Sequence, residues 1–435
     1  MDKNDFLGSF AQENVLFSTQ IIRTAAVGDN FYKAMIFVEN TRFVDVSNPA
    51  WIAVPGSTSA KALTVTASDY AEYTSGLLQS WLYDLFCSGF TGDCILVACG
   101  DISVTYTYTP VTLENGADIT GLGYYHRAAG SSDEWVLATE TTADTTTYEY
   151  ASRDAGTVDP TSFLTGLEAA YAIMKPYAYH KTVCAGDTLN PTVALEFARL
   201  CAADKGLLSS APLYPFTTAT PETPESDPIY SVLHTANIDA FMSAHQDTTR
   251  NAALVSLGIA LASYNGSGTP VGNNMEMTAT GMITSSGASG LGLAKSIRDA
   301  LANINVQTWK PVGDNTGNVA AFGALTLNGD TYSATWILAY ITYMVKVRVA
   351  QMLTEGNFLK NAANYGRIIT VMQGYIALFG DKGSGRLENI NITAPAFANL
   401  PDSAADEIVV PNAWSATYVS NVRKVTITGT LYIGA

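Results

Sequence analysis

The chain has 435 residues, of which 47% are hydrophobic and 14% are charged, and it carries a formal net charge of −16. This hydrophobic content argues against a disordered chain, and the length is sufficient for two or three domains with sizeable cores. The negative charge opposes general binding to nucleic acid or to an anionic membrane surface, so neither is an expected partner.

The low content of charged residues predicts a surface rich in hydroxyl and amide groups, which suits burial against other protein. The cysteines form no CxxC pair and lie in apolar surroundings, so we expect buried free thiols of a reducing cytoplasm: Cys87, Cys94, Cys99, Cys184 and Cys201. The first residues lack the basic start and apolar core of a secretion signal. No apolar run reaches the ~20 residues that a membrane-spanning helix needs.

The first hundred residues predict an arm followed by the beginning of an α/β layer. Residues 1–30 are polar with sparse apolar alternation, which favours an extended arm whose apolar positions include Val15, Phe17 and Ile21. The run 34–38 and the segment 94–100 are continuously apolar, as in strands covered on both faces. Between these two strands, residues 63–68 predict a short strand, and Ser68 is placed as the N-cap of a following helix. The stretch after Gly76 predicts an amphipathic helix. We therefore assign residues 31–101 to the first part of an α/β core.

The character of the sequence changes at residues 102–155, which are rich in Thr and Tyr and punctuated by turn residues. This composition predicts an inserted antiparallel β module. Its aromatic residues Tyr124, Tyr125, Trp135, Tyr148 and Tyr150 suit either packing across strands or recognition of a partner.

The α/β pattern returns in residues 156–420, which we assign to the remainder of the core. Asp159-Pro160 and Asn190-Pro191 are helix starts, and 180–186 predicts the strand between these helices. The proline-rich tract 217–228 predicts a solvent loop, and helices are expected at 238–246 and 251–265.

Towards its end the chain predicts a strand that closes in the Asn328-Gly329 turn and a long helix at 334–354. This helix is apolar on nearly all sides, with Lys346 and Arg348 as its only charges, so it should be buried or docked onto another surface. A further helix is expected around 366–379. Residues 421–435 alternate as a strand, with one face formed by Val425, Ile427, Leu431 and Ile433.

The closing strand needs a partner edge, because a lone ribbon is marginal in water. It is either paired within its own sheet or donated to a neighbouring chain, and the second option means assembly.

No catalytic constellation emerges from the motifs. The chain has no GxSxG, HExxH or DxDxDG pattern. Gly287, Gly290 and Gly292 before Lys295 miss the phosphate-loop pattern, so a surface loop before a helix is the better interpretation. The four histidines and the scattered acids stand in no recognisable frame. We therefore assign no catalytic residue, cofactor or metal ligand, and do not expect an enzyme.

Three stretches of the chain resemble the sheath protein of contractile phage tails and related injection machines. They are LTVTASDYAEYTSGLLQSWLYDLFCSGFTGDCILVACG, then FLTGLEAAYAIMKPYAYHKTVCAGD with TVALEFARLCAADKGLLSSAPLYP, and INVQTWKPVGDNTGNVAAFGALTLNGDTYSATWILAYITYMVKVRVAQML. They are spread over residues 63–353, and the likeness rests on the order and spacing of elements.

The resemblance implies a mixed α/β (α+β) fold: a mixed sheet flanked by helices, with the inserted β module and extended N- and C-terminal arms. It implies that the arms 1–30 and 421–435 insert into neighbouring copies, so that a helical homo-oligomer surrounds an inner tail tube. Baseplate and tail terminator proteins are further implied partners, in a virion tail assembled in the host cytoplasm. The long helix with Lys346 and Arg348 is the candidate for the tube-facing element.

Other functions remain open at this point. Another structural protein of a virion or injection machine, such as a tube or capsid protein, would also assemble, although a tube is normally shorter and mostly β. A surface-layer protein would explain the Thr and Gly content but not the missing signal. A hydrolase of unfamiliar type would need a convergent pocket.

Overall fold

The computed structural model describes residues 32–45, 47–48, 50–54, 60–87, 89–205, 208–217, 223–245, 250–262, 276–277, 293–311, 319–322, 325–354, 358–381, 383, 385–401, 408–410 and 413–419. The chain forms two compact units, one comprising Asp101–Phe163 and the other the rest of the chain. Both expected arms lie outside the described residues, with their positions Val15, Phe17, Ile21, Val425, Ile427, Leu431 and Ile433. The same holds for the glycines of the 287–292 loop.

A five-stranded sheet in the order β11-β1-β4-β3-β2 forms the first half of the larger unit. Strand β1 pairs in parallel with β11 and with the central strand β4, whereas β3 is antiparallel to β4 and β2 is antiparallel to β3. All of β1 and nearly all of β4 are buried, as their continuous apolar sequences predict. Strand β11 is also fully buried, although His180, Lys181 and Thr182 are polar. The strands are β1 Ala34–Glu39, β2 Ile52–Ala53, β3 Lys61–Val65, β4 Cys94–Gly100 and β11 His180–Cys184.

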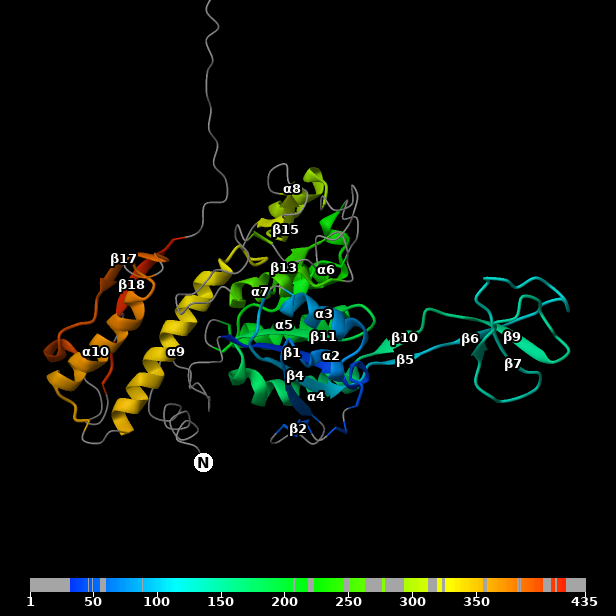
Figure 1. The fold of residues 1–435 in the computed structure, drawn as a ribbon, viewed down its shortest axis with the longest axis horizontal. Coiled ribbons are helices and arrows are strands. Elements are labelled where there is room, and N and C mark those ends of the chain that lie inside the picture. Colours follow the sequence, from blue (N-terminus) through cyan, green and yellow to red (C-terminus); the bar gives the residue numbers. More distant parts are fainter. Residues whose placement is uncertain are drawn as a thin grey trace, which may run out of the picture. The chain divides into compact units, whose positions relative to one another are not determined.

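A second five-stranded sheet has the order β12-β13-β15-β16-β14. Strands β12, β13 and β15 are parallel, and β16 and β14 complete the sheet in antiparallel pairing. The Thr182 hydroxyl of β11 donates to the Leu213 carbonyl of β12, which joins the two sheets. The strands are β12 Leu213–Pro215, β13 Phe241–Ala244, β14 Glu276–Met277, β15 Gln307–Pro311 and β16 Val319–Phe322. Mixed sheets flanked by helices confirm the expected fold class (Figure 1).

The helices of this α/β region pack around the sheets. Phe37 of β1 contacts Tyr171 of α4 and Phe197 of α5, with ring centroids 5.8 and 5.4 Å apart, so both helices lie on the same face of β1. Helix α3 packs against α7, which is buried over most of its length. The helices are α2 Tyr70–Tyr73, α3 Gly76–Phe86, α4 Thr161–Met174, α5 Pro191–Ala203, α6 Pro228–Ala236, α7 Ala252–Ala262 and α8 Lys295–Asn303. Short 3-10 helices occupy Asn40–Arg42, Lys175–Tyr177, Pro224–Ser226 and Phe397–Asn399.

Three local expectations were wrong. The segment predicted as a helix at 238–246 contains strand β13, because a short apolar run between buried elements has no distinguishing periodicity. Asp227 is fully buried and not part of a solvent loop, since its carboxylate caps α6 by accepting the N–H groups of Ile229 and Tyr230. The cap position of α2 is Asp69 and not Ser68.

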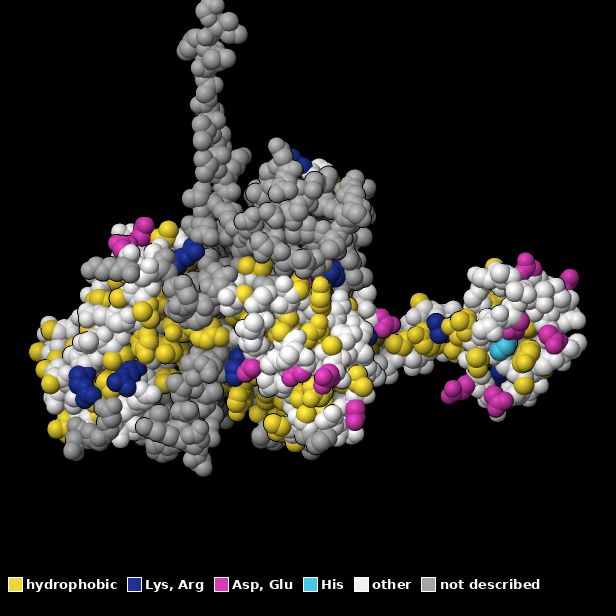
Figure 2. Space-filling view, in the orientation of Figure 1, with side chains coloured by type: hydrophobic (Ala, Val, Ile, Leu, Met, Phe, Trp, Pro, Cys, Tyr) yellow, Lys and Arg dark blue, Asp and Glu magenta, His cyan; other side chains and the backbone are white. Residues whose placement is uncertain are grey.

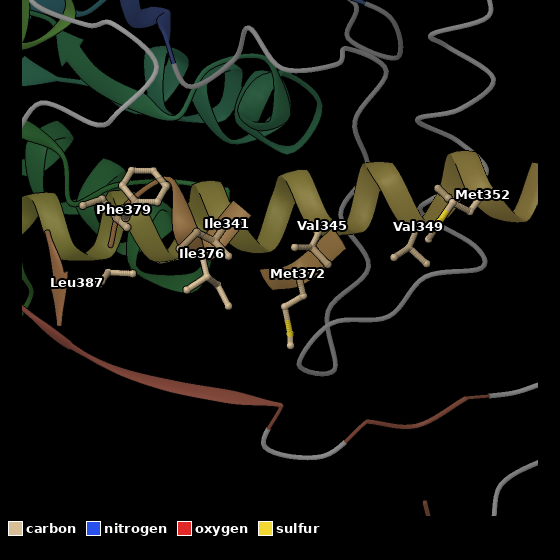
Figure 3. Packing of buried hydrophobic residues seen from close by; sticks show 10 residues of the cluster. Ile341, Val345, Val349, Met352, Met372, Ile376, Phe379 and Leu387 are labelled. Carbon is tan, nitrogen blue, oxygen red and sulfur yellow. The ribbon is translucent and has the colours of Figure 1, made fainter. Parts of the chain in front are cut away.

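The last part of the larger unit is a helical pair covered by a two-stranded sheet. Helix α9 (Tyr332–Thr354) packs along α10 (Ala362–Ala377), and β17 (Leu387–Ile392) pairs with β18 (Trp414–Tyr418). Figure 3 shows the apolar cluster that α9 and α10 share with the start of β17. Its members include Ile341, Val345, Val349, Met352, Met372, Ile376, Phe379 and Leu387.

The smaller unit, Asp101–Phe163, is all β apart from the first residues of α4. Four strands form an antiparallel sheet in the order β6-β9-β7-β8, and β5 pairs with β10. Ile119, Ala143 and Tyr150 form its small core. The strands are β5 Ser103–Thr105, β6 Tyr108–Val111, β7 Tyr125–Ala128, β8 Val136–Leu137, β9 Tyr148–Arg153 and β10 Thr157–Asp159 (Figure 1).

Candidate assembly surface

The sheet of β17 and β18 is the best candidate for a functional surface in the larger unit. Its two strands run antiparallel from the pair Leu387 and Tyr418 to the pair Ile392 and Trp414, with an irregularity after Glu388. Along β18, half-buried and exposed residues alternate, and the half-buried Trp414, Ala416 and Tyr418 pack on the apolar cluster of α9 and α10. The sheet therefore has one face on a core and the other open to solvent.

Of the described strands, only β17 pairs with β18 and only β18 pairs with β17. The Leu387 N–H donates to the Phe379 carbonyl, 2.7 Å between N and O, so the loop after α10 covers the start of β17. A two-stranded sheet is marginal by itself, and strand edges are the positions where a further strand adds. Among the described residues, no further strand is paired with either edge of this sheet.

Exposed apolar side chains lie in α9, near both ends of α10 and in β17. Leu359 is 64% exposed, Leu338 is 49% exposed, and Leu378 and Ile390 are also exposed. Figure 2 shows hydrophobic side chains over the area in which Figure 1 places α9 and α10. Exposed apolar groups of this kind favour a protein contact over a free surface.

The two charges expected to face a tube from α9 have different positions. Arg348 is exposed, and its guanidinium donates to Gln351 at 2.8 Å. Lys346 is only 2% exposed, and its ammonium has no hydrogen-bond acceptor among the described residues. Because two residues of a helix differ by about 200° around its axis, the two side chains leave α9 on opposite sides. The burial of Lys346 does not suit a contact with a tube, whereas the exposed position of Arg348 suits a surface contact.

Burial lowers the pKa of Lys346 to about 8. In the unfolded chain the lysine has its ordinary pKa of about 10.4. Between about pH 8 and about pH 10.4 the unfolded chain therefore binds more protons than the folded one, and the free energy of unfolding rises with pH. We expect Lys346→Met to stabilise the protein at pH 7 by about 2 kcal/mol and to remove this rise, because it removes a buried charge without an ion-pair partner. Urea denaturation at pH 7 and pH 10 measures both effects, with Arg348→Met as the exposed control. A Lys346→Met variant that is no more stable at pH 7 would contradict the prediction.

Helix α9 is fixed to the α/β region at its first turn. The Tyr332 hydroxyl donates to Ser210 Oγ at 2.7 Å and lies 3.0 Å from His180 Nδ1. The His180 ring also meets Trp336 edge-on, at 4.8 Å between centroids. Burial lowers the pKa of His180 to about 3, so this contact is made by a neutral imidazole. This contact could not be predicted from the sequence, since His180 and Tyr332 are far apart along the chain.

The arrangement closest to catalytic chemistry is a lysine next to a serine. Lys181 Nζ donates to Ser209 Oγ at 3.0 Å and to the Leu208 carbonyl at 2.7 Å, and Tyr171 Oη lies 2.8 Å from Ser209 Oγ. Burial lowers the pKa of Lys181 to about 7, which would suit a general base. However, Lys181 is 1% exposed and Ser209 is fully buried, so a substrate has no approach to the pair. The group satisfies polar atoms within the core.

The remaining reactive groups form no site. All five cysteines are free thiols, and burial raises the pKa of Cys201 to about 12, so this thiol stays protonated. In the part of the chain that the structure describes, no three His, Cys, Asp or Glu residues are grouped so that they could hold a metal ion. Within the same residues, no helix combines the length and apolar character needed to cross a bilayer.

Comparisons with known proteins assign no family. No protein-family model matches the chain, and the search of curated proteins found no match.

Proposed function

We propose that this chain is the structural protomer of a contractile tail sheath, which assembles helically around an inner tail tube and contracts to drive the tube through a host envelope. The observation that carries the proposal is the two-stranded sheet of β17 and β18, which lies on an apolar layer and pairs with no other described strand. The partners are other copies of the chain, the tube protein, and baseplate and tail terminator proteins. The protein acts in the virion tail after assembly in the host cytoplasm and needs neither a cofactor nor catalysis.

The proposed contact is a donated strand. The segment 421–435 of one copy adds to the sheet of β17 and β18 in a neighbour, which supplies main-chain hydrogen bonds. The apolar face with Val425 and Ile427 then packs on the layer formed by α9 and α10. A contact between two different surfaces of the same protein is head-to-tail, and it generates a helix when the rotation between copies does not close.

Contraction follows from repacking of such interfaces. Donated strands keep neighbours attached while the bodies of the protomers move as rigid units from a higher-energy to a lower-energy arrangement. The work then comes from differences in interface free energy, without bond cleavage. The exposed position of Arg348 in α9 supports it as the candidate for a contact with the tube.

The first test is assembly with a changed strand face. We expect Ile427→Asp to abolish formation of rods or hollow cylinders in negative-stain micrographs, because it places a carboxylate on the apolar layer of α9 and α10 that lies under the sheet of β17 and β18. Thr426→Asp is the matched control. The alternation of the sequence assigns Thr426 to the opposite face of the same strand, so this variant should leave assembly intact. The proposal fails if the unmodified chain stays monomeric at high concentration, or if both variants assemble equally well.

A further inference from the structure

The smaller unit carries all its positive charge on one face of its sheet. Residues 101–163 contain ten Asp and Glu residues, no lysine, and two arginines, Arg127 and Arg153. In the β6-β9-β7-β8 sheet, Arg153 pairs with Tyr108, Ala151 with Tyr125, and Glu149 with Arg127. Because paired residues and alternate residues of a strand share a face, both arginines lie on the same side as Tyr108 and Tyr125. The opposite side carries Tyr150, which belongs to the small core.

The side chains on this face form a continuous ladder of rings and guanidinium groups. Trp135 stacks on Tyr108 with 5.7 Å between centroids, and Tyr108 meets Tyr125 edge-on at 5.4 Å. The Arg127 guanidinium lies 4.5 Å from the Trp135 ring, and that of Arg153 lies 4.0 and 4.5 Å from the rings of Tyr106 and Tyr125. We call these six residues the aromatic-arginine face: Tyr106, Tyr108, Tyr125, Arg127, Trp135 and Arg153.

The aromatic-arginine face is open to solvent. Tyr106 and Arg153 are exposed and the other four side chains are half-buried, although they cover Ala151 completely. Trp, Tyr and Arg are the residue types that dominate the binding energy of protein interfaces, whereas lysine is depleted there. Mutual stacking also holds these side chains in place before binding, which lowers the entropy lost on association.

We infer that the aromatic-arginine face is a docking surface for a second copy of this chain, and that it binds an acidic part of that copy. Charge complementarity supports this partner. Arg127 is paired with Glu149, whereas the Arg153 guanidinium has no carboxylate partner among the described residues and is available for one on a second copy. The chain has 39 Asp and Glu residues against 23 Lys and Arg residues, so a second copy offers many carboxylates. Figure 2 shows acidic side chains at several separate places on the smaller unit. The contact is again head-to-tail, as helical growth requires. The choice of a second copy as partner rests on the proposed function, but the contact is separate from the donated strand.

Hydrogen exchange of the full chain tests the inference directly. We compare dispersed and assembled protein by mass spectrometry, and expect slower exchange after assembly in peptides that cover 103–111 and 123–137. Arg153→Glu should raise the concentration needed for assembly at least about tenfold, since it replaces an attractive charge with a repulsive one. Leu122→Glu is the control, because it introduces a carboxylate away from this face, at an exposed position of the loop that holds the core residue Ile119.

The outcomes separate this inference from the proposed function. Cylinders that form with unchanged exchange in both peptides, or an Arg153→Glu variant that assembles like the unmodified chain, overturn the docking surface alone. If the aromatic-arginine face exchanges more slowly after assembly but Ile427→Asp does not affect assembly, the donated strand alone is overturned. Protection of the face, weakened by Arg153→Glu and not by Leu122→Glu, supports the docking surface.

Discussion

Replacing Gly166 with alanine is expected to prevent folding of the larger unit. Gly166 lies in α4 where this helix crosses the end of β4, and an added Cβ would stand 1.7 Å from the Cys99 carbonyl oxygen and 2.8 Å from its carbonyl carbon. Both are backbone atoms of a buried strand, so no side-chain rotation relieves the clash. We expect a loss of more than about 4 kcal/mol in the free energy of unfolding, seen as insoluble protein or a collapsed urea midpoint.

Helix α10 offers the matched control. An added Cβ at Gly374 meets no atom within 4 Å, and the residue is exposed. Gly374→Ala should therefore stabilise the protein by about 0.5 to 1 kcal/mol, since alanine is the better helix former. A Gly166→Ala variant with the urea midpoint of the unmodified chain would show that α4 does not approach β4 this closely.

The parts of the fold that could be predicted from the sequence are those with a continuous apolar run or a clear helix-capping pattern. Strand β1 and strand β4 are continuous apolar runs bounded by polar residues, and burial on both faces is the physical cause of that pattern. Helix α5 begins where Asn190 precedes a proline, and the Asn190 side chain does accept the N–H groups of Thr192 and Val193. In both cases local chemistry and tertiary environment agree.

The helices and strands that the sequence did not predict are short, or they form only because of contacts with residues that are distant in the sequence. Strand β12 has three residues and β13 has four, so neither is long enough to show a period. Helix α6 was missed because Asp227, its N-cap, lies in a tract whose prolines resemble those of a loop. Strand β17 has mostly polar or exposed residues, and its state depends on pairing with β18.

The candidate surface could be predicted only in part. The apolar character of α9 correctly indicated a docked helix, but it could not tell which charge lies inside, because a helix that is apolar all round has no polar side to orient it. The aromatic residues of the β module were visible in the sequence, whereas their division between a core side and an open side follows from the register of β7 and β9. Register of this kind depends on pairing partners that are distant in sequence.

A large loss of stability is also expected when Asp84, a fully buried carboxylate in α3, is replaced. Its Oδ2 accepts the Asn251 N–H at 2.6 Å, just before the first residue of α7, and its Oδ1 accepts the Arg250 guanidinium, with Nε 2.5 Å away. Asn251 in turn accepts the Leu254 N–H and so caps α7. One carboxylate thus ties the start of a buried helix to α3, which packs against it.

Asp84→Ala should cost about 3 to 5 kcal/mol, because it leaves the Arg250 charge and a buried N–H without their acceptor. Urea denaturation measures the loss, and faster exchange of the Asn251 amide locates it at the start of α7. Asp299→Ala is the control, since the exposed pair of Asp299 with Lys295 should contribute less than about 0.5 kcal/mol. Joint replacement by Asp84→Leu and Arg250→Met should recover part of the loss, because an apolar pair leaves no buried charge unpaired. A loss below about 1 kcal/mol for Asp84→Ala would mean that water replaces the carboxylate, and that the contact between α3 and α7 is less enclosed than its burial indicates.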